Sequence, residues 1–105
     1  MKRVLMLTGD VNLMNVTDPQ VPFARVKDTL GQADVLFGNL ECCFYEAAIG
    51  HPVEREGFYA PLVSAEALVI GGYHAVGNAN NVNYGEEAIR SSRSEERRVG
   101  KECRL

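Results

Sequence analysis

The chain of 105 residues is poor in residue types on which many sites depend, with no tryptophan, two histidines and three cysteines. Cys42 and Cys43 are adjacent and Cys103 is remote, a spacing that fits neither a disulfide framework nor a CxxC zinc site. We expect these cysteines to be reduced and to pack as small apolar side chains. The motifs GxGxxG, Walker A, GxSxG and HExxH are also missing, which argues against nucleotide-binding, serine-hydrolase and zincin functions.

The charge balance excludes another group of functions. The chain has 11 basic and 14 acidic residues and a formal net charge of −3, with no basic stripe, so we expect no nucleic-acid partner. Met1-Lys2-Arg3 is typical of the start of a signal peptide, but the apolar run that follows is too short and ends at Gly9-Asp10. We therefore expect a cytoplasmic protein. A hydrophobic content of 46% predicts one small folded domain.

Three short apolar runs are each followed by polar residues. The runs cover residues 4–8, 33–37 and 73–77, and they lead into Gly9-Asp10, Gly38-Asn39-Leu40-Glu41 and Asn78-Ala79-Asn80-Asn81. We interpret them as parallel strands, whose carboxyl ends meet at one edge of a sheet and collect ligand-binding groups there. The first run does not alternate between apolar and polar residues, which predicts a strand covered on both faces.

Helical patterns separate these runs. A helix is predicted over 21–30, with Pro22 in its first turn and Gly31 as its stop. A second helix is predicted over 65–70, capped by Ser64, and a last one opens at Tyr84-Gly85 with an acidic first turn. Residues 42–62 have no clear period and predict a long loop. The expected class is α/β, with three β-loop-α units, right-handed crossovers and a mainly parallel sheet.

The composition changes abruptly at Arg93. Residues 93–105 carry five basic and three acidic side chains, a net charge of +2, which leaves −5 on residues 1–92. A solvated helix end would explain such a run. However, residues 93–103 resemble the in-frame translation of a common sequencing adapter. We therefore predict that residues 93–105 are a non-native tail on a fragment, which sequencing the source DNA across codon 92 would test.

The polar segments, taken in order, carry a family resemblance. The segments are Gly9-Asp10-Val11-Asn12-Leu13-Met14, the stretch Ala33 to Glu41, and Ala79-Asn80-Asn81 followed by Tyr84-Gly85-Glu86. They resemble successive motifs of the CapA-like poly-gamma-glutamate capsule biosynthesis proteins, of the calcineurin-like metallophosphatase superfamily. The resemblance implies that residues 1–92 are the N-terminal part of a metallo-dependent phosphatase-like domain, a truncated α/β sandwich.

The same resemblance implies a metal centre. It implies Asp10 and Glu41 as acidic ligands, Asn81 as an amide ligand and Asn39 as an additional contact. Carboxylate and amide oxygens favour hard cations, so the cofactor implied is Mn or Mg. Asn12 and Val82 stand where the superfamily commonly has histidine, so no residue is assigned as catalytic acid.

Simpler roles stay open for each of these residues. Asp10 and Glu41 could be loop carboxylates, and the asparagines could serve left-handed turns. His51 and His74 lack ligand spacing, and we expect them to be structural or exposed.

Three functional hypotheses follow. The first is a metal-dependent phosphoester hydrolase acting on a small-molecule or polymer substrate. The second is a non-catalytic accessory of membrane-associated capsule machinery. The third is a truncated, loosely folded product without activity, because three parallel strands would leave sheet edges and one face uncovered.

Overall fold

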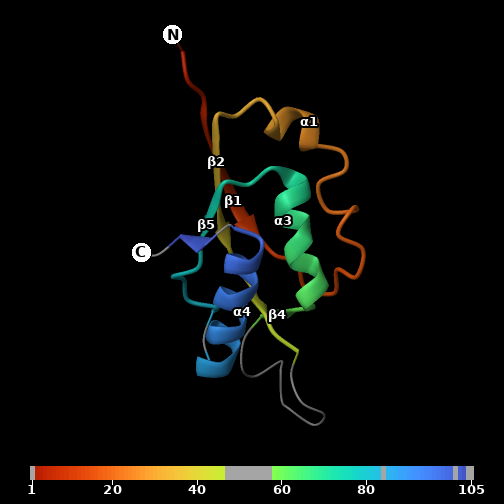
Figure 1. Ribbon diagram of the computed structural model, residues 1–105, viewed down its shortest axis with the longest axis vertical. Helices are drawn as coiled ribbons and strands as arrows, with labels where there is room; N and C mark the ends of the chain where they lie inside the picture. Colours follow the sequence, from red (N-terminus) through yellow and green to blue (C-terminus); the bar gives the residue numbers. More distant parts are fainter. Residues whose placement is uncertain (1, 47–57, 84, 101, 104–105) are drawn as a thin grey trace.

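A four-stranded parallel sheet forms the centre of the protein (Figure 1). The computed structural model describes residues 2–46, 58–83, 85–100 and 102–103. The strands are β1 (Leu5–Val11), β2 (Val35–Leu40), β5 (Ala75–Gly77) and β6 (Glu102–Cys103), side by side in that order. Every neighbouring pair is parallel, which confirms the predicted α/β class with a mainly parallel sheet.

The helices lie together on one side of this sheet (Figure 1). They are α1 (Lys27–Leu30), α3 (Glu66–Gly71), which follows the 3₁₀ turn η1 (Leu62–Ala65), and α4 (Glu86–Arg98). Because the strands follow one another across the sheet in chain order, right-handed crossovers place every connecting helix on the same face. The buried core forms between that face and the helices, and it includes Leu36, Leu40, Leu68 and Val76.

The opposite face of the sheet is open in the described part of the chain. Leu5 and Leu7 of β1 remain 64% and 66% exposed, and Val35 of β2 remains 47% exposed. The prediction that the first strand is covered on both faces is therefore wrong, because no described helix crosses to that side. Among the described residues, the uncovered sheet face that we expected is present.

The strands run further into the polar segments than their apolar runs predict. β1 continues through Gly9-Asp10 to Val11, and β2 continues through Gly38-Asn39 to Leu40. Asn39 is therefore a strand residue, where the sequence predicted a loop. Glycine at position 38 has a packing reason: a Cβ there would lie 2.6 Å from the Thr8 hydroxyl oxygen and 2.8 Å from the Tyr73 ring.

Two helix predictions need correction. The segment 21–26 forms successive tight turns, and only Lys27–Leu30 is α-helical. Within those turns the Ala24 N–H bonds to the carbonyl three residues back, and the β-branched Val21 and Val26 lower the helix propensity. Ser64 is not a helix cap, because it lies inside η1 and its buried hydroxyl donates to the Pro61 carbonyl at 2.6 Å.

The region predicted as a long loop contains a second, two-stranded sheet. Its strands, β3 (Cys43–Phe44) and β4 (Tyr59–Ala60), pair in parallel. Residues 47–57, with His51 among them, lie outside the described residues. Cys42 and Cys43 are buried and reduced, as expected, and burial raises the pKa of their thiols to about 12 and about 11.

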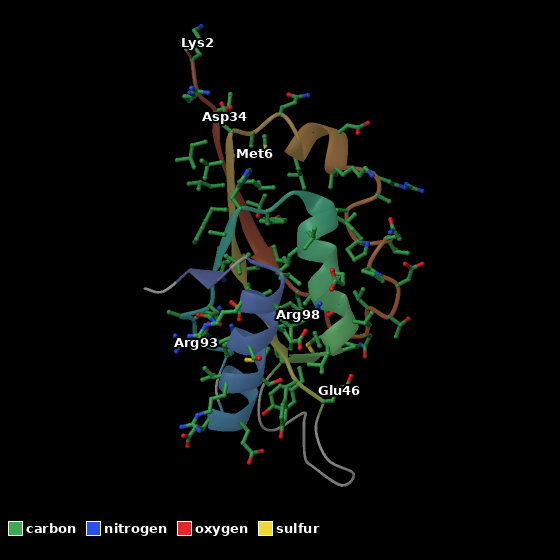
Figure 2. The ribbon with its side chains drawn as sticks, in the orientation of Figure 1. Lys2, Met6, Asp34, Glu46, Arg93 and Arg98 are labelled. Carbon is green, nitrogen blue, oxygen red and sulfur yellow. The ribbon has the colours of Figure 1, made fainter. Side chains whose placement is uncertain are left out.

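The last described helix, α4, passes through Arg93 without a break. Its residue Glu96 is fully buried and accepts hydrogen bonds from Ser92 and Asn78. Figure 2 shows Arg98 reaching from α4 toward α3, where it pairs with Glu66 at 2.7 Å. The adapter origin of residues 93–105 stays a prediction, because a charged segment of any origin can extend a helix. Among the described residues, no helix has the length and apolar character to cross a membrane.

Candidate metal centre

Polar side chains from three segments meet at the carboxyl edge of the sheet. Asp10 belongs to β1, Asn39 to β2, and Asn80 to the turn that follows β5. The Asn39 amide donates to the Asp10 carboxylate at 2.8 Å, and the Asn80 amide donates to the Asn39 side-chain oxygen at 3.0 Å. Strand ends that are distant in the sequence thus place one carboxylate and two amides in a continuous hydrogen-bonded row.

A β-bulge in β1 decides where Asp10 lies. Leu7 pairs with Phe37 and Asp10 pairs with Asn39, so β1 has two residues between these positions where β2 has one. Since side chains alternate along a strand, the extra residue moves Asp10 to the face that carries Leu7 and Asn39. Without the bulge, Asp10 would point to the covered face with Thr8, away from the Asn39 side chain.

Glu41, directly after β2, brings a second carboxyl group to Asp10. In its protonated form Glu41 can donate a hydrogen bond to the Asp10 carboxylate. The pKa of Glu41 is raised, first by partial loss of hydration, then by the negative charge of Asp10 and by this hydrogen bond. A pair of carboxyl groups that repel each other when both are ionised is a place where a cation would bind favourably.

The amide that reaches the cluster is that of Asn80. Its nitrogen donates to the Leu40 carbonyl at 2.9 Å as well as to Asn39, and its oxygen accepts from the backbone N–H groups of Val82 and Asn83, both at 3.2 Å. Asn81, the residue that the family resemblance implies as a ligand, is exposed in the same turn. The structure therefore brings Asp10, Asn39 and Glu41 together with Asn80, and leaves the Asn81 side chain on the surface.

Asn83 is a second residue that the sequence reasoning did not single out. Its side-chain nitrogen donates to the carbonyls of Leu40 at 2.7 Å and of Asn78 at 3.2 Å, while its buried side-chain oxygen has no hydrogen-bond partner among the described residues. A signal for both residues was present, because asparagine in a run of turn residues commonly bonds to the backbone two or three positions on. The run Asn78 to Asn83 fits that pattern.

The donor set fits a hard divalent cation. The described residues contain no group of three or more His, Cys, Asp or Glu side chains that could hold a metal ion, so the site offers a carboxylate pair rather than an acidic cluster. Asp10 and Glu41 supply charged oxygens, and the exposed edge leaves room for water ligands of the kind that Mg²⁺ and Mn²⁺ retain. The missing histidine and cysteine ligands make the described site a poor one for Zn²⁺.

No described histidine approaches this cluster. His74 accepts a hydrogen bond from the Leu36 N–H at 2.9 Å, so it has the structural role that we expected. Asn12 accepts from the Met14 N–H at 2.9 Å and closes a turn, and Val82 is half-buried. Neither of these two positions, where the family resemblance would place histidine, therefore carries a side chain that could act as a general acid.

A cavity of about 440 Å³ borders the same end of β1. Its wall includes Asp10, Phe23 and Leu30, together with Thr8 and Tyr73, whose hydroxyl groups bond to each other at 2.8 Å. Phe23 closes one side, with its ring 5.4 Å from that of Tyr73. The volume of this cavity falls in the range of small-molecule pockets, about 300–1,000 Å³.

Comparison with known proteins gives two results. A search of curated proteins found no match. The family profile described as bacterial capsule synthesis protein PGA_cap matches residues 4–100, which covers all three polar segments of the candidate centre. The chain therefore belongs to the bacterial capsule synthesis protein PGA_cap family.

Proposed function

We propose that this protein acts in capsule polymer synthesis as a metal-dependent phosphoester hydrolase whose centre is built on Asp10 and Glu41. The observation that supports the proposal most directly is that Asp10 and Glu41 both lie at the carboxyl edge of the parallel sheet, where Asp10 pairs with Asn39 and the Glu41 N–H donates to the Val11 carbonyl at 2.8 Å. Such an edge is the usual ligand position in open α/β sheets. A bound Mn²⁺ or Mg²⁺ would neutralise their mutual repulsion.

In this proposal two carboxylates of the chain hold the cation, and an amide keeps one of these carboxylates in place. Asp10 and Glu41 would hold the cation, and Asn39 keeps the Asp10 carboxylate in place through its 2.8 Å hydrogen bond. When bound, a divalent cation polarises a phosphoryl oxygen and lowers the pKa of a water molecule. The cavity beside Asp10 offers space for the remainder of a small substrate.

Metal binding to the full chain tests this function first. We expect calorimetry to detect Mn²⁺ binding that Asp10→Ala and Glu41→Ala each abolish, because either change removes half of the charged ligands. Asp28→Ala is the matched control, since Asp28 is an exposed acid on α1, away from the sheet edge. Metal-dependent hydrolysis of an aryl phosphate should be lost in the same two variants and kept in the control. Failure of the wild-type chain to bind Mn²⁺ would refute the proposal.

A second candidate function has its own supporting observation. Asn12 and Val82 provide no general acid, and the described histidine, His74, is engaged by the Leu36 backbone. A centre of this kind would bind a cation and a phosphorylated ligand without cleaving it, as a component of membrane-associated capsule machinery. Mn²⁺ binding without turnover of any phosphoester between pH 5 and 9 would favour this function, and metal-dependent turnover would exclude it.

A further inference from the structure

The orientation of the Asn80 side-chain amide is set by backbone groups. Its nitrogen faces the Leu40 carbonyl, which can only accept a hydrogen bond. Its oxygen faces the N–H groups of Val82 and Asn83, which can only donate. Turning the amide over would break all three contacts, so these backbone groups distinguish the amide oxygen from the amide nitrogen.

This orientation determines that of Asn39. The second N–H of Asn80 points at the Asn39 side chain, so Asn39 must present its oxygen there. The Asn39 nitrogen then faces Asp10 and donates to its carboxylate. Three backbone groups, the Leu40 carbonyl at the end of β2 and two N–H groups of the turn after β5, thus fix through two amides the direction in which an N–H reaches the Asp10 carboxylate.

Asn83 reinforces the start of this row. Its amide donates to the same Leu40 carbonyl, at 2.7 Å, and to the Asn78 carbonyl at 3.2 Å. The end of β2 and the turn 78–83 are therefore joined by two side chains that converge on one backbone oxygen. Because Asn83 is buried, these bonds are shielded from competing water.

We propose that Asn80 and Asn39 form a positioning relay that holds the Asp10 carboxylate for cation binding, and that the adjacent Asn81 has no part in it. The claim rests on the proposed function in so far as it concerns a cation. It assigns Asn39 the role of a hydrogen-bond donor to Asp10, with its oxygen turned to Asn80. In related settings, loss of a residue that orients a metal ligand lowers metal affinity by about 10–100-fold.

The test compares neighbouring asparagines in the full chain. We expect Asn80→Ala to weaken Mn²⁺ binding by about tenfold or more, and the exposed Asn81→Ala to change it less than about twofold. If the relay acts through Asn39, the losses should not add. The double variant Asn39→Ala/Asn80→Ala should then bind Mn²⁺ about as weakly as whichever of the two single variants has the lower Mn²⁺ affinity. Equal losses in Asn80→Ala and Asn81→Ala, or additive losses at positions 39 and 80, would overturn the relay.

A measurement without metal separates this inference from the proposed function. The side-chain amide protons of Asn39 should exchange slowly in the metal-free wild type, faster in Asn80→Ala, and at the wild-type rate in Asn81→Ala. Should the wild-type chain bind no Mn²⁺, the proposed function fails while this exchange pattern still decides the relay. An Asn39 exchange rate unaffected by Asn80→Ala rejects the relay, whatever the metal result.

Discussion

The two faces of the central sheet are made by the same strands and have opposite environments. On β2, Leu36 is fully buried while its neighbour Val35 is 47% exposed. On β1, Met6 is half-buried under the helices while Leu5 and Leu7 are about two-thirds exposed. Both faces are apolar in sequence, so residue type does not distinguish them. The difference comes from the crossover direction, which places α1, α3 and α4 on one side.

The comparison also explains why the candidate centre lies at the sheet edge rather than in the core. Alternation along β1 would have turned Asp10 toward the covered face. The bulge between Leu7 and Asp10 reverses that alternation and brings Asp10 beside Asn39. Figure 2 shows Asp34, the residue directly before β2, at the other, amino end of the sheet.

The largest expected difference between the faces is in core packing. Leu36→Ala should lower the free energy of unfolding by about 2–5 kcal/mol, because it leaves a cavity under the helices. Leu7→Ala, on the open face, should change it by less than about 0.5 kcal/mol. Urea denaturation followed by tyrosine fluorescence measures both. Equal losses would mean that something covers the open face in solution.

Alanine substitutions of two glycines test how tightly the strands of the sheet are packed. Gly38→Ala should destabilise the fold by about 1–3 kcal/mol, because the new methyl group would lie 2.6 Å from the Thr8 hydroxyl oxygen and 2.8 Å from the Tyr73 ring. Gly9→Ala is the matched control on β1, since nothing lies within 4 Å of its added methyl group. Thermal unfolding of the two variants tests the pair, and a greater loss in Gly9→Ala would contradict the packing described.

A smaller loss of stability is expected when the hydrogen bond between the Thr8 and Tyr73 hydroxyl groups on the covered face is removed. Thr8→Val removes one partner of the 2.8 Å bond to the Tyr73 hydroxyl and should cost about 0.5–1.5 kcal/mol. Thr17→Val, at an exposed loop position, is the control and should be close to neutral. Chemical denaturation of both variants provides the measurement. A neutral Thr8→Val would show that the hydroxyl pair adds nothing to the covered face.

The smallest expected effect is a pH dependence of folding stability that comes from Glu41 at the carboxyl edge of the sheet. The pKa of Glu41 is raised in the folded chain above its ordinary value of 4.5, so the folded state holds its proton more tightly than the unfolded state does. Its contribution to stability is therefore greatest below that value and is lost as pH rises through the raised pKa. Carbon NMR of the Glu41 carboxyl group should report the shift.

The matched variant for this titration is Asp10→Asn, which removes the repelling charge and should return the Glu41 pKa toward its ordinary range. Saturating Mn²⁺ should remove the decline in stability above pH 4.5 if the cation binds between the two carboxyl groups. A Glu41 pKa that is unchanged in Asp10→Asn would show that the two carboxyl groups do not interact.

Most of the residues that meet at the carboxyl edge of the sheet could be predicted from the sequence, because the strands lie in the sheet in the order in which they occur in the chain. Apolar runs ending in polar residues were sufficient to predict parallel strands, and to predict that Asp10, Asn39 and Glu41 would lie near one another. The choice between Asn80 and Asn81 could not be made that way. Adjacent residues of one type differ only in which backbone groups the turn brings within their reach.

The sequence by itself determined the parallel α/β class, the family and the end of the sheet at which polar groups gather, because these follow from local apolar runs and short motifs. Only the tertiary structure decided which sheet face is covered, where the bulge turns Asp10, and which asparagine reaches Asn39. Those outcomes depend on pairing register and crossover direction. Both are set by contacts between segments that are distant in the sequence, which no local pattern encodes.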